Sequence, residues 1–138
     1  MYLLPILILI QDFSAQNTVD MRKTRLIYTR IKEEAREIIL NTTTKIANKH
    51  GFKYNQVRVK SQKTRLGSCS SKKNLNFNWQ IAKFPQEVME YVIKHELAHL
   101  KQPNHSIRYW REVEKIDPHY KKHHNWIKEN AHRYMSFN

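Results

Sequence analysis

The chain has 138 residues, which is enough for one compact domain with its own core and too few to expect two. Its 25 Lys and Arg outnumber its 12 Asp and Glu, which gives a formal net charge of +13. Such a charge favours the binding of phosphates or acidic partners; the alternative is that the basic surface serves solubility alone. The single cysteine, Cys69, excludes a disulfide within the chain and is typical of a reduced intracellular protein, so we expect a cytoplasmic location.

An apolar run, MYLLPILILI, occupies the first ten residues, and a polar stretch follows it. The run is too short to span a membrane, contains Pro5 and lacks a basic start, so it predicts no membrane contact; a poorly formed signal peptide is the alternative. We expect residues 1–18 to be an apolar strand or tail with a linker, and residues 19–138 to form the domain.

From about Val19, apolar side chains recur at the spacing of an amphipathic helix. Gly51 supplies a stop at its C-terminal end. The predicted buried stripe consists of Ile27, Ile31, Ala35, Ile38, Thr42 and Ile46.

Two later segments, YNQVRVKS and NLNFNWQ, alternate apolar with polar residues, as half-buried strands do. Gly67 lies between them in TRLGSCS, and SSKKN is a plausible turn. The pattern predicts a small, mostly antiparallel sheet that follows one helix.

The segment QEVMEYVIKHELAHLK after Pro85 is apolar on more than one side, which predicts a buried helix opened by that proline. His95 and His99 are one turn apart, so both imidazoles emerge on one face and can bind one ion, with Glu96 beside them. The five-residue HExxH pattern also arises by chance in long helices, but the buried helix favours a metal site.

A third histidine strengthens this interpretation. His105 lies ten residues after His95, about 15 Å away along an unbroken helix. Pro103 forbids that continuation and Asn104 tolerates left-handed backbone angles, so the turn can fold His105 back toward the other two histidines. We expect one Zn²⁺ per chain, with a ligand set of His95, His99 and His105.

Three neutral imidazoles leave Zn²⁺ a fourth position for a water molecule, whose pKa falls from ~16 toward ~7. Glu96 can accept the proton of that water and pass it to a leaving amine. A catalytic site is favoured over a purely structural zinc, because Glu96 would otherwise be a charge buried without use.

The sequence TRLGSCSSKKNLNFNWQIAKFPQEVMEYVIKHELAHLKQPNHSIRYW resembles the YgjP-like family of small zinc metallopeptidases, which are related to SprT-like and WLM proteases. The resemblance runs from about Ile31 to Ala131 and rests on GSCS, the Asn-rich strand, HELAH, and NHS with Trp110 four residues on. Leu66 stands where the family usually has Trp, which is expected to alter packing. The β-rich N-terminal half of full-length members is missing, so the resemblance indicates the catalytic half only, in a truncated or minimal member.

The resemblance implies an α+β fold, a minimal zincin-like domain with an N-terminal helix, the small sheet, the HExxH helix and two following helices. It implies that His95, His99 and His105 bind zinc and that Glu96 is the general base. In such folds an edge strand pairs with an extended peptide, and NLNFNWQ is either that edge or an ordinary core strand.

Two neighbours of the third histidine are weaker candidates. Asn104 and Ser106 can hold that ligand, and Ser106 can instead be the N-cap of the next helix. Elsewhere, His119 and His123 have no adjoining acidic base, so an amphipathic helix explains them better than a second metal site. Cys69 is expected to be a small packing residue and not a nucleophile.

The implied function is a zinc-dependent metallopeptidase acting on peptide or protein substrates. The alternatives are a nucleoside triphosphate (UTP) pyrophosphatase, with which the family has been linked, and a zinc-stabilised nucleic-acid-binding module. With only Gly51 and Gly67 there is no Gly-rich phosphate loop, which counts against the nucleotide reading. A basic cluster can contact phosphates or nucleic acid, or be a solvated strand face; it consists of Arg58, Lys60, Lys63 and Arg65.

Overall fold

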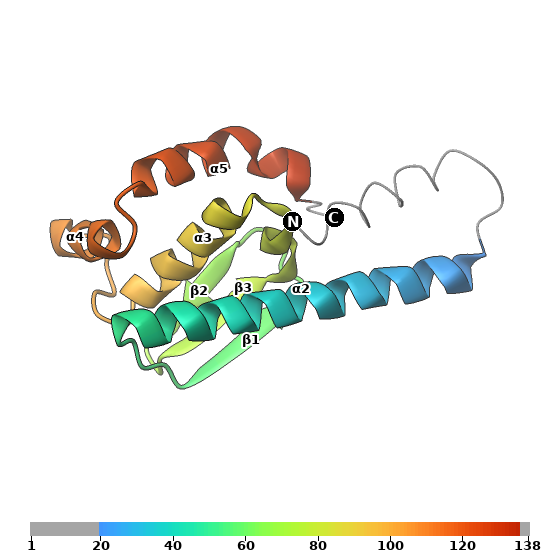
Figure 1. Ribbon diagram of the computed structural model, residues 1–138, viewed down its shortest axis with the longest axis horizontal. Helices are drawn as coiled ribbons and strands as arrows, with labels where there is room; N and C mark the ends of the chain where they lie inside the picture. Colours follow the sequence, from blue (N-terminus) through green and yellow to red (C-terminus); the bar gives the residue numbers. More distant parts are fainter. Residues whose placement is uncertain (1–19, 136–138) are drawn as a thin grey trace.

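The computed structural model describes residues 20–135 (Figure 1). The apolar N-terminal run and its predicted linker lie outside this range, so their expected packing stays a prediction. In chain order the described elements are α2 (Met21–His50), β1 (Gln56–Lys60), β2 (Gly67–Cys69), β3 (Asn74–Asn78), the 3₁₀ helix η1 (Trp79–Lys83), α3 (Gln86–Ala98), α4 (Ile107–Ile116) and α5 (Tyr120–Tyr134).

Helix α2 is the predicted N-terminal helix, and both of its ends have clear causes. The Asp20 side chain accepts a hydrogen bond from the Arg22 amide, and Gly51 ends the helix with φ of 71°. Residues 21–30 are exposed and extend beyond the sheet in Figure 1, so the predicted burial of Ile27 is wrong. The buried stripe consists of Ile31, Ala35, Ile39, Thr43, Ile46 and Ala47.

The sheet is mixed, with strand order β1-β3-β2, and the prediction of a mostly antiparallel sheet is wrong. β2 and β3 form an antiparallel pair, as their short connection requires, whereas β1 lies parallel to β3 on its other side. Because β3 is central, NLNFNWQ is a core strand and not an edge, and its Leu75 and Phe77 are fully buried.

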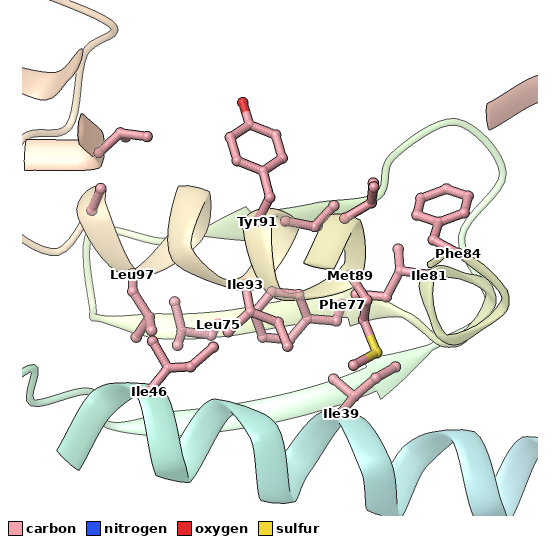
Figure 2. Packing of buried hydrophobic residues seen from close by; sticks show 14 of the residues in the cluster. Ile39, Ile46, Leu75, Phe77, Ile81, Phe84, Met89, Tyr91, Ile93 and Leu97 are labelled. Carbon is pink, nitrogen blue, oxygen red and sulfur yellow. The ribbon is translucent and has the colours of Figure 1, made fainter. Parts of the chain in front are cut away.

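Helices α2 and α3 pack on each other and on the sheet, and the core lies between them (Figure 2). Side chains from both helices and from the sheet meet there, including Ile39 of α2, Phe77 of β3 and Ile93 of α3. The opposite face of the sheet is polar, because the outward positions of the strands carry Arg58, Asn76 and Ser68. The core therefore fixes α3, the HExxH helix, firmly against the sheet.

The two helices after α3 complete the predicted α+β architecture. Ser106 accepts a hydrogen bond from the Tyr109 amide and caps α4, whose Tyr109 and Val113 are buried. Helix α5 packs against α3. Among the described residues, no helix combines the length and apolar character needed to cross a membrane.

Candidate metal centre

The end of α3 and the turn after it carry the three predicted histidines. His95 lies in the last turn of α3, and His99 is its C-terminal cap residue. The chain then turns tightly, with the Gln102 amide bonded to the Ala98 carbonyl, and Pro103 prevents further helix. The turn returns His105 to the other two histidines, as the helix break at Pro103 predicted.

The reversal does not use the backbone angle expected of Asn104. Within residues 20–135, Lys73 is the only non-glycine residue with a positive φ, so the prediction of left-handed geometry at Asn104 is wrong. The Asn104 carbonyl instead accepts a hydrogen bond from the Ser106 amide at 2.8 Å. Ser106 caps α4, so both residues shape the turn that carries His105.

The Nε2 atoms of the three histidines converge on one point. The His105 Nε2 lies 3.1 Å from the His99 Nε2 and 3.3 Å from the His95 Nε2. Three nitrogens about 2.0–2.1 Å from one tetrahedral Zn²⁺ lie about 3.3–3.4 Å apart. The cluster therefore has the dimensions of a site for one small metal ion, and it is the one group of three potential ligands found among the described residues.

Hydrogen bonds at Nδ1 orient two of these rings. The His99 Nδ1 lies 3.0 Å from the Gln102 carbonyl, which can only accept, so Nδ1 carries the proton and Nε2 keeps its lone pair. The His95 Nδ1 lies 3.4 Å from the Tyr91 hydroxyl, which is also 3.1 Å from the His124 Nδ1. Each of these two rings thus has a partner that directs Nε2 toward the cluster.

The electrostatics of the cluster favour neutral imidazoles. Burial, followed by the neighbouring histidines, lowers the pKa of His95 to about 3. Burial also lowers the pKa of His99. Neutral imidazole is the form that binds metal, so these two side chains are ready to coordinate at neutral pH.

Two aromatic residues of α4 brace the cluster. The buried Tyr109 hydroxyl donates a hydrogen bond to the His95 carbonyl at 2.9 Å, and its ring stacks on His99 with centroids 4.4 Å apart. The Trp110 ring stacks on His105 at 5.9 Å. These contacts attach α4 to the end of α3 and restrict the imidazole rings.

Glu96 is only 7% exposed and lies under strand β2. A Cβ added at Gly67 would be 3.0 Å from the Glu96 Cγ and 3.2 Å from its Oε1, so the glycine leaves the space that the carboxyl group occupies. Burial raises the pKa of Glu96 to about 7, and Arg65 opposes this shift. A carboxyl group with this pKa can take up and release a proton near neutral pH.

The predicted basic cluster lies on the surface of the protein. All four members of the basic cluster are exposed; Arg58 and Lys60 lie on β1, Lys63 and Arg65 in the loop before β2. Of these four side chains, Arg65 is the one that lowers the pKa of Glu96.

The structure gives two other sequence candidates structural roles. The buried His123 pairs through Nδ1 with Asp117 at 2.9 Å, a contact that joins the start of α5 to the end of α4. Cys69 is half-buried against the core, and burial raises the pKa of its thiol, which disfavours the nucleophilic thiolate.

Sequence reasoning missed Tyr91, Tyr109 and His124 as neighbours of the cluster. Tyr91 precedes His95 by four residues and shares its helix face, so the spacing alone could have identified it. Tyr109 and His124 reach the site from α4 and α5, and no local pattern marks them.

Comparisons with known proteins identify the family. A family model described as "YgjP-like, metallopeptidase domain" matches residues 9–130. The chain belongs to the YgjP-like family. The YgjP-like domain is thus a metallopeptidase domain, and the protein is a metal-dependent hydrolase, as the sequence resemblance implied.

Two solved structures resemble the YgjP-like domain. The crystal structure of the metallopeptidase zymogen of Pyrococcus abyssi abylysin is 27% identical, with a TM-score of 0.61 over 71% of this chain and 99% of abylysin. The metallopeptidase zymogen of Methanocaldococcus jannaschii jannalysin shares the fold at 24% identity, with a TM-score of 0.60 over 67% of this chain and 96% of jannalysin. The search of curated proteins found no match.

Proposed function

We propose that this metallopeptidase is a zinc peptidase in which His95, His99 and His105 bind the metal and Glu96 is the general base. The observation that carries the proposal is the convergence of three Nε2 atoms beside a buried carboxyl group, with that of His105 at 3.1 Å from His99 and 3.3 Å from His95. An all-imidazole donor set suits zinc and disfavours Mg²⁺ and Ca²⁺, which prefer oxygen ligands.

The protein residues then divide the chemistry between them. The three imidazoles would hold Zn²⁺, which would act as a Lewis acid able to polarise a carbonyl group and lower the pKa of water. Glu96 takes the proton of the attacking water and delivers it to the leaving amine, a cycle that its raised pKa favours. Tyr91 and the Gln102 carbonyl hold the Nδ1 protons of His95 and His99.

Strand β2 is the best-placed element to align the substrate. It is an edge strand, and Gly67 at its start contacts Glu96. An extended peptide that adds to this edge would run past the carboxyl group of Glu96. We therefore assign substrate pairing to β2, whereas the sequence had suggested NLNFNWQ, which forms the central strand β3.

The direct test is a comparison of the wild type with Glu96→Gln, which keeps the shape of the side chain but cannot accept the proton. Turnover of a casein or fluorogenic peptide library should fall at least ~100-fold, with zinc content unchanged. Glu87→Gln makes the same change at an exposed position of α3 and should leave turnover unaltered. Equal turnover in Glu96→Gln and wild type would exclude Glu96 as the base.

The same experiment separates peptidase from nucleotide chemistry. UTP hydrolysis that depends on Glu96, in a protein that cleaves no peptide, would replace the peptidase proposal. Independently of that outcome, we propose that the basic cluster contacts nucleic-acid phosphates, since all four of its side chains are exposed on a protein of net charge +13.

A further inference from the structure

A pocket of about 320 Å³ opens between α4 and α5, outside the cluster of histidines. The aromatic rings of Trp110 and Tyr120 form one part of its wall, stacked on each other with centroids 5.4 Å apart. Lys121, His124 and Asn125 complete the lining. The pocket therefore combines aromatic side chains with polar and basic ones.

Trp110 connects this pocket to the metal centre. The same indole that lines the pocket stacks on His105 at 5.9 Å and meets His95 edge-on at 6.1 Å. His124 lines the pocket as well, and it bonds to the Tyr91 hydroxyl beside His95. A peptide whose scissile bond lies at the histidines therefore has a neighbouring side chain within reach of the pocket.

The lining indicates which side chain fits. Aromatic side chains in the lining favour another aromatic ring, because edge-to-face contacts add to the burial of apolar surface. At the rim, Lys121 is exposed, and no carboxylate lines the pocket to neutralise it. The ammonium group lies 5.8 Å from the Tyr120 ring centre, so a negative charge next to a bound aromatic ring would meet a cation.

We propose that this pocket is a substrate subsite that accepts an aromatic side chain adjacent to the scissile bond and, through Lys121, prefers an acidic residue next to it. The proposal rests on the peptidase function above and specifies the substrate class.

The test uses a matched set of peptides that differ only beside the cleaved bond, carrying Phe-Asp, Ala-Asp, Phe-Lys or Ala-Lys. Wild type should cleave the Phe-Asp peptide at least ~10-fold faster, in kcat/KM, than Ala-Asp, a ratio within reach of an apolar pocket. Tyr120→Leu should lower the Phe-to-Ala ratio several-fold. Lys121→Glu should reverse the Asp-to-Lys preference.

Lys122→Glu is the matched control, because it makes the same charge change on the adjacent exposed residue, which does not line the pocket. Its preferences should equal those of the wild type. Equal shifts in Lys121→Glu and Lys122→Glu, or a Phe-to-Ala ratio of one in the wild type, would overturn the subsite. Lys121 is exposed, so its variant tests the proposal even if Tyr120→Leu folds poorly.

A binding measurement separates failure of the subsite from failure of the peptidase function. Fluorescently labelled versions of the same peptides are titrated into Glu96→Gln protein, alone and combined with Lys121→Glu or Lys122→Glu, and anisotropy is recorded. Tighter binding of Phe-Asp that is lost only with Lys121→Glu supports the pocket even if no peptide is cleaved. Cleavage that requires Glu96 but shows no preference among the four peptides retains the peptidase and rejects the pocket.

Discussion

Gly67 lies so close to Glu96 that a Cβ at Gly67 would be 3.0 Å from the Glu96 Cγ and 3.1 Å from the Asn76 carbonyl oxygen. The edge strand β2 can thus approach the HExxH helix only because this residue has no side chain. The contact places the strand and the carboxyl group in one site.

Gly67→Ala should therefore destabilise the protein by about 1–3 kcal/mol. The new Cβ would be too close to the Asn76 backbone oxygen, which cannot move aside, and to the Glu96 side chain, which should be displaced. Peptide turnover should fall, and thermal unfolding and kcat/KM measure the two effects. Gly51→Ala is the contrasting control: its Cβ meets no atom, but its φ of 71° is strained, so it should cost about 1 kcal/mol without lowering turnover. Full activity in Gly67→Ala would contradict the role of the contact.

Removal of any proposed ligand should remove the metal. We expect purified protein to carry about one zinc, and His95→Ala, His99→Ala or His105→Ala to lose it with a lower melting temperature, because metal bound only to the folded state stabilises it. His119→Ala alters an exposed histidine outside the cluster and should keep its zinc. Zinc content by mass spectrometry provides the measurement; unchanged zinc affinity in His105→Ala would remove the third ligand from the proposal.

The Tyr91 hydroxyl should support zinc binding without touching the metal. Tyr91→Phe keeps the buried ring but removes the oxygen 3.4 Å from the His95 Nδ1, so zinc affinity should fall by about 10-fold or more. Competition with a fluorescent chelator measures this affinity. Tyr134→Phe, on the partly exposed end of α5, should have no effect, and a similar loss in both variants would argue against a specific bond to His95.

Burial raises the pKa of Glu96 to about 7. We therefore expect the stability of the metal-free protein to depend on pH. Between the unfolded-state value of about 4.3 and the folded-state value, the unfolded chain releases a proton that the folded chain retains. Stability is therefore lost as pH rises through this window, by at most about 4 kcal/mol, and stays constant above it.

Glu96→Gln has no such titration. In the presence of a chelator it should unfold at a higher temperature than wild type at pH 8, and the difference should vanish near pH 4. Calorimetry across this pH range measures it. A constant difference at all pH values would show that shape and not ionisation separates the two proteins.

The basic cluster should make DNA binding depend on salt. Reversing the charges of Arg58 and Lys60 should lower the slope of log affinity against log salt by roughly two, because about one counterion is released per phosphate contact. Reversing the charges of Lys45 and Lys49, exposed on α2, changes the net charge equally and should leave the slope nearly unchanged. Equal slopes in wild type and both variants would show that the basic cluster is a solvated surface that makes no phosphate contacts.

The sequence by itself determined the features that depend on local geometry. The period of the α-helix places His95 and His99 on one face, and Pro103 requires the helix to end before His105, so their meeting was predictable. Gly51 and Pro85 marked helix ends for similar local reasons. These are effects of bond rotation and spacing within a few residues.

Tertiary structure alone decided the features that depend on packing between distant segments. The parallel pairing of β1 with β3 contradicted the antiparallel expectation because strand order is set by burial and not by succession along the chain. The approach of Gly67 to Glu96, the bond from Tyr91 to His124, and the pocket beside Trp110 each join separate elements. No local pattern encodes such contacts, because they form only when the hydrophobic core brings those elements together.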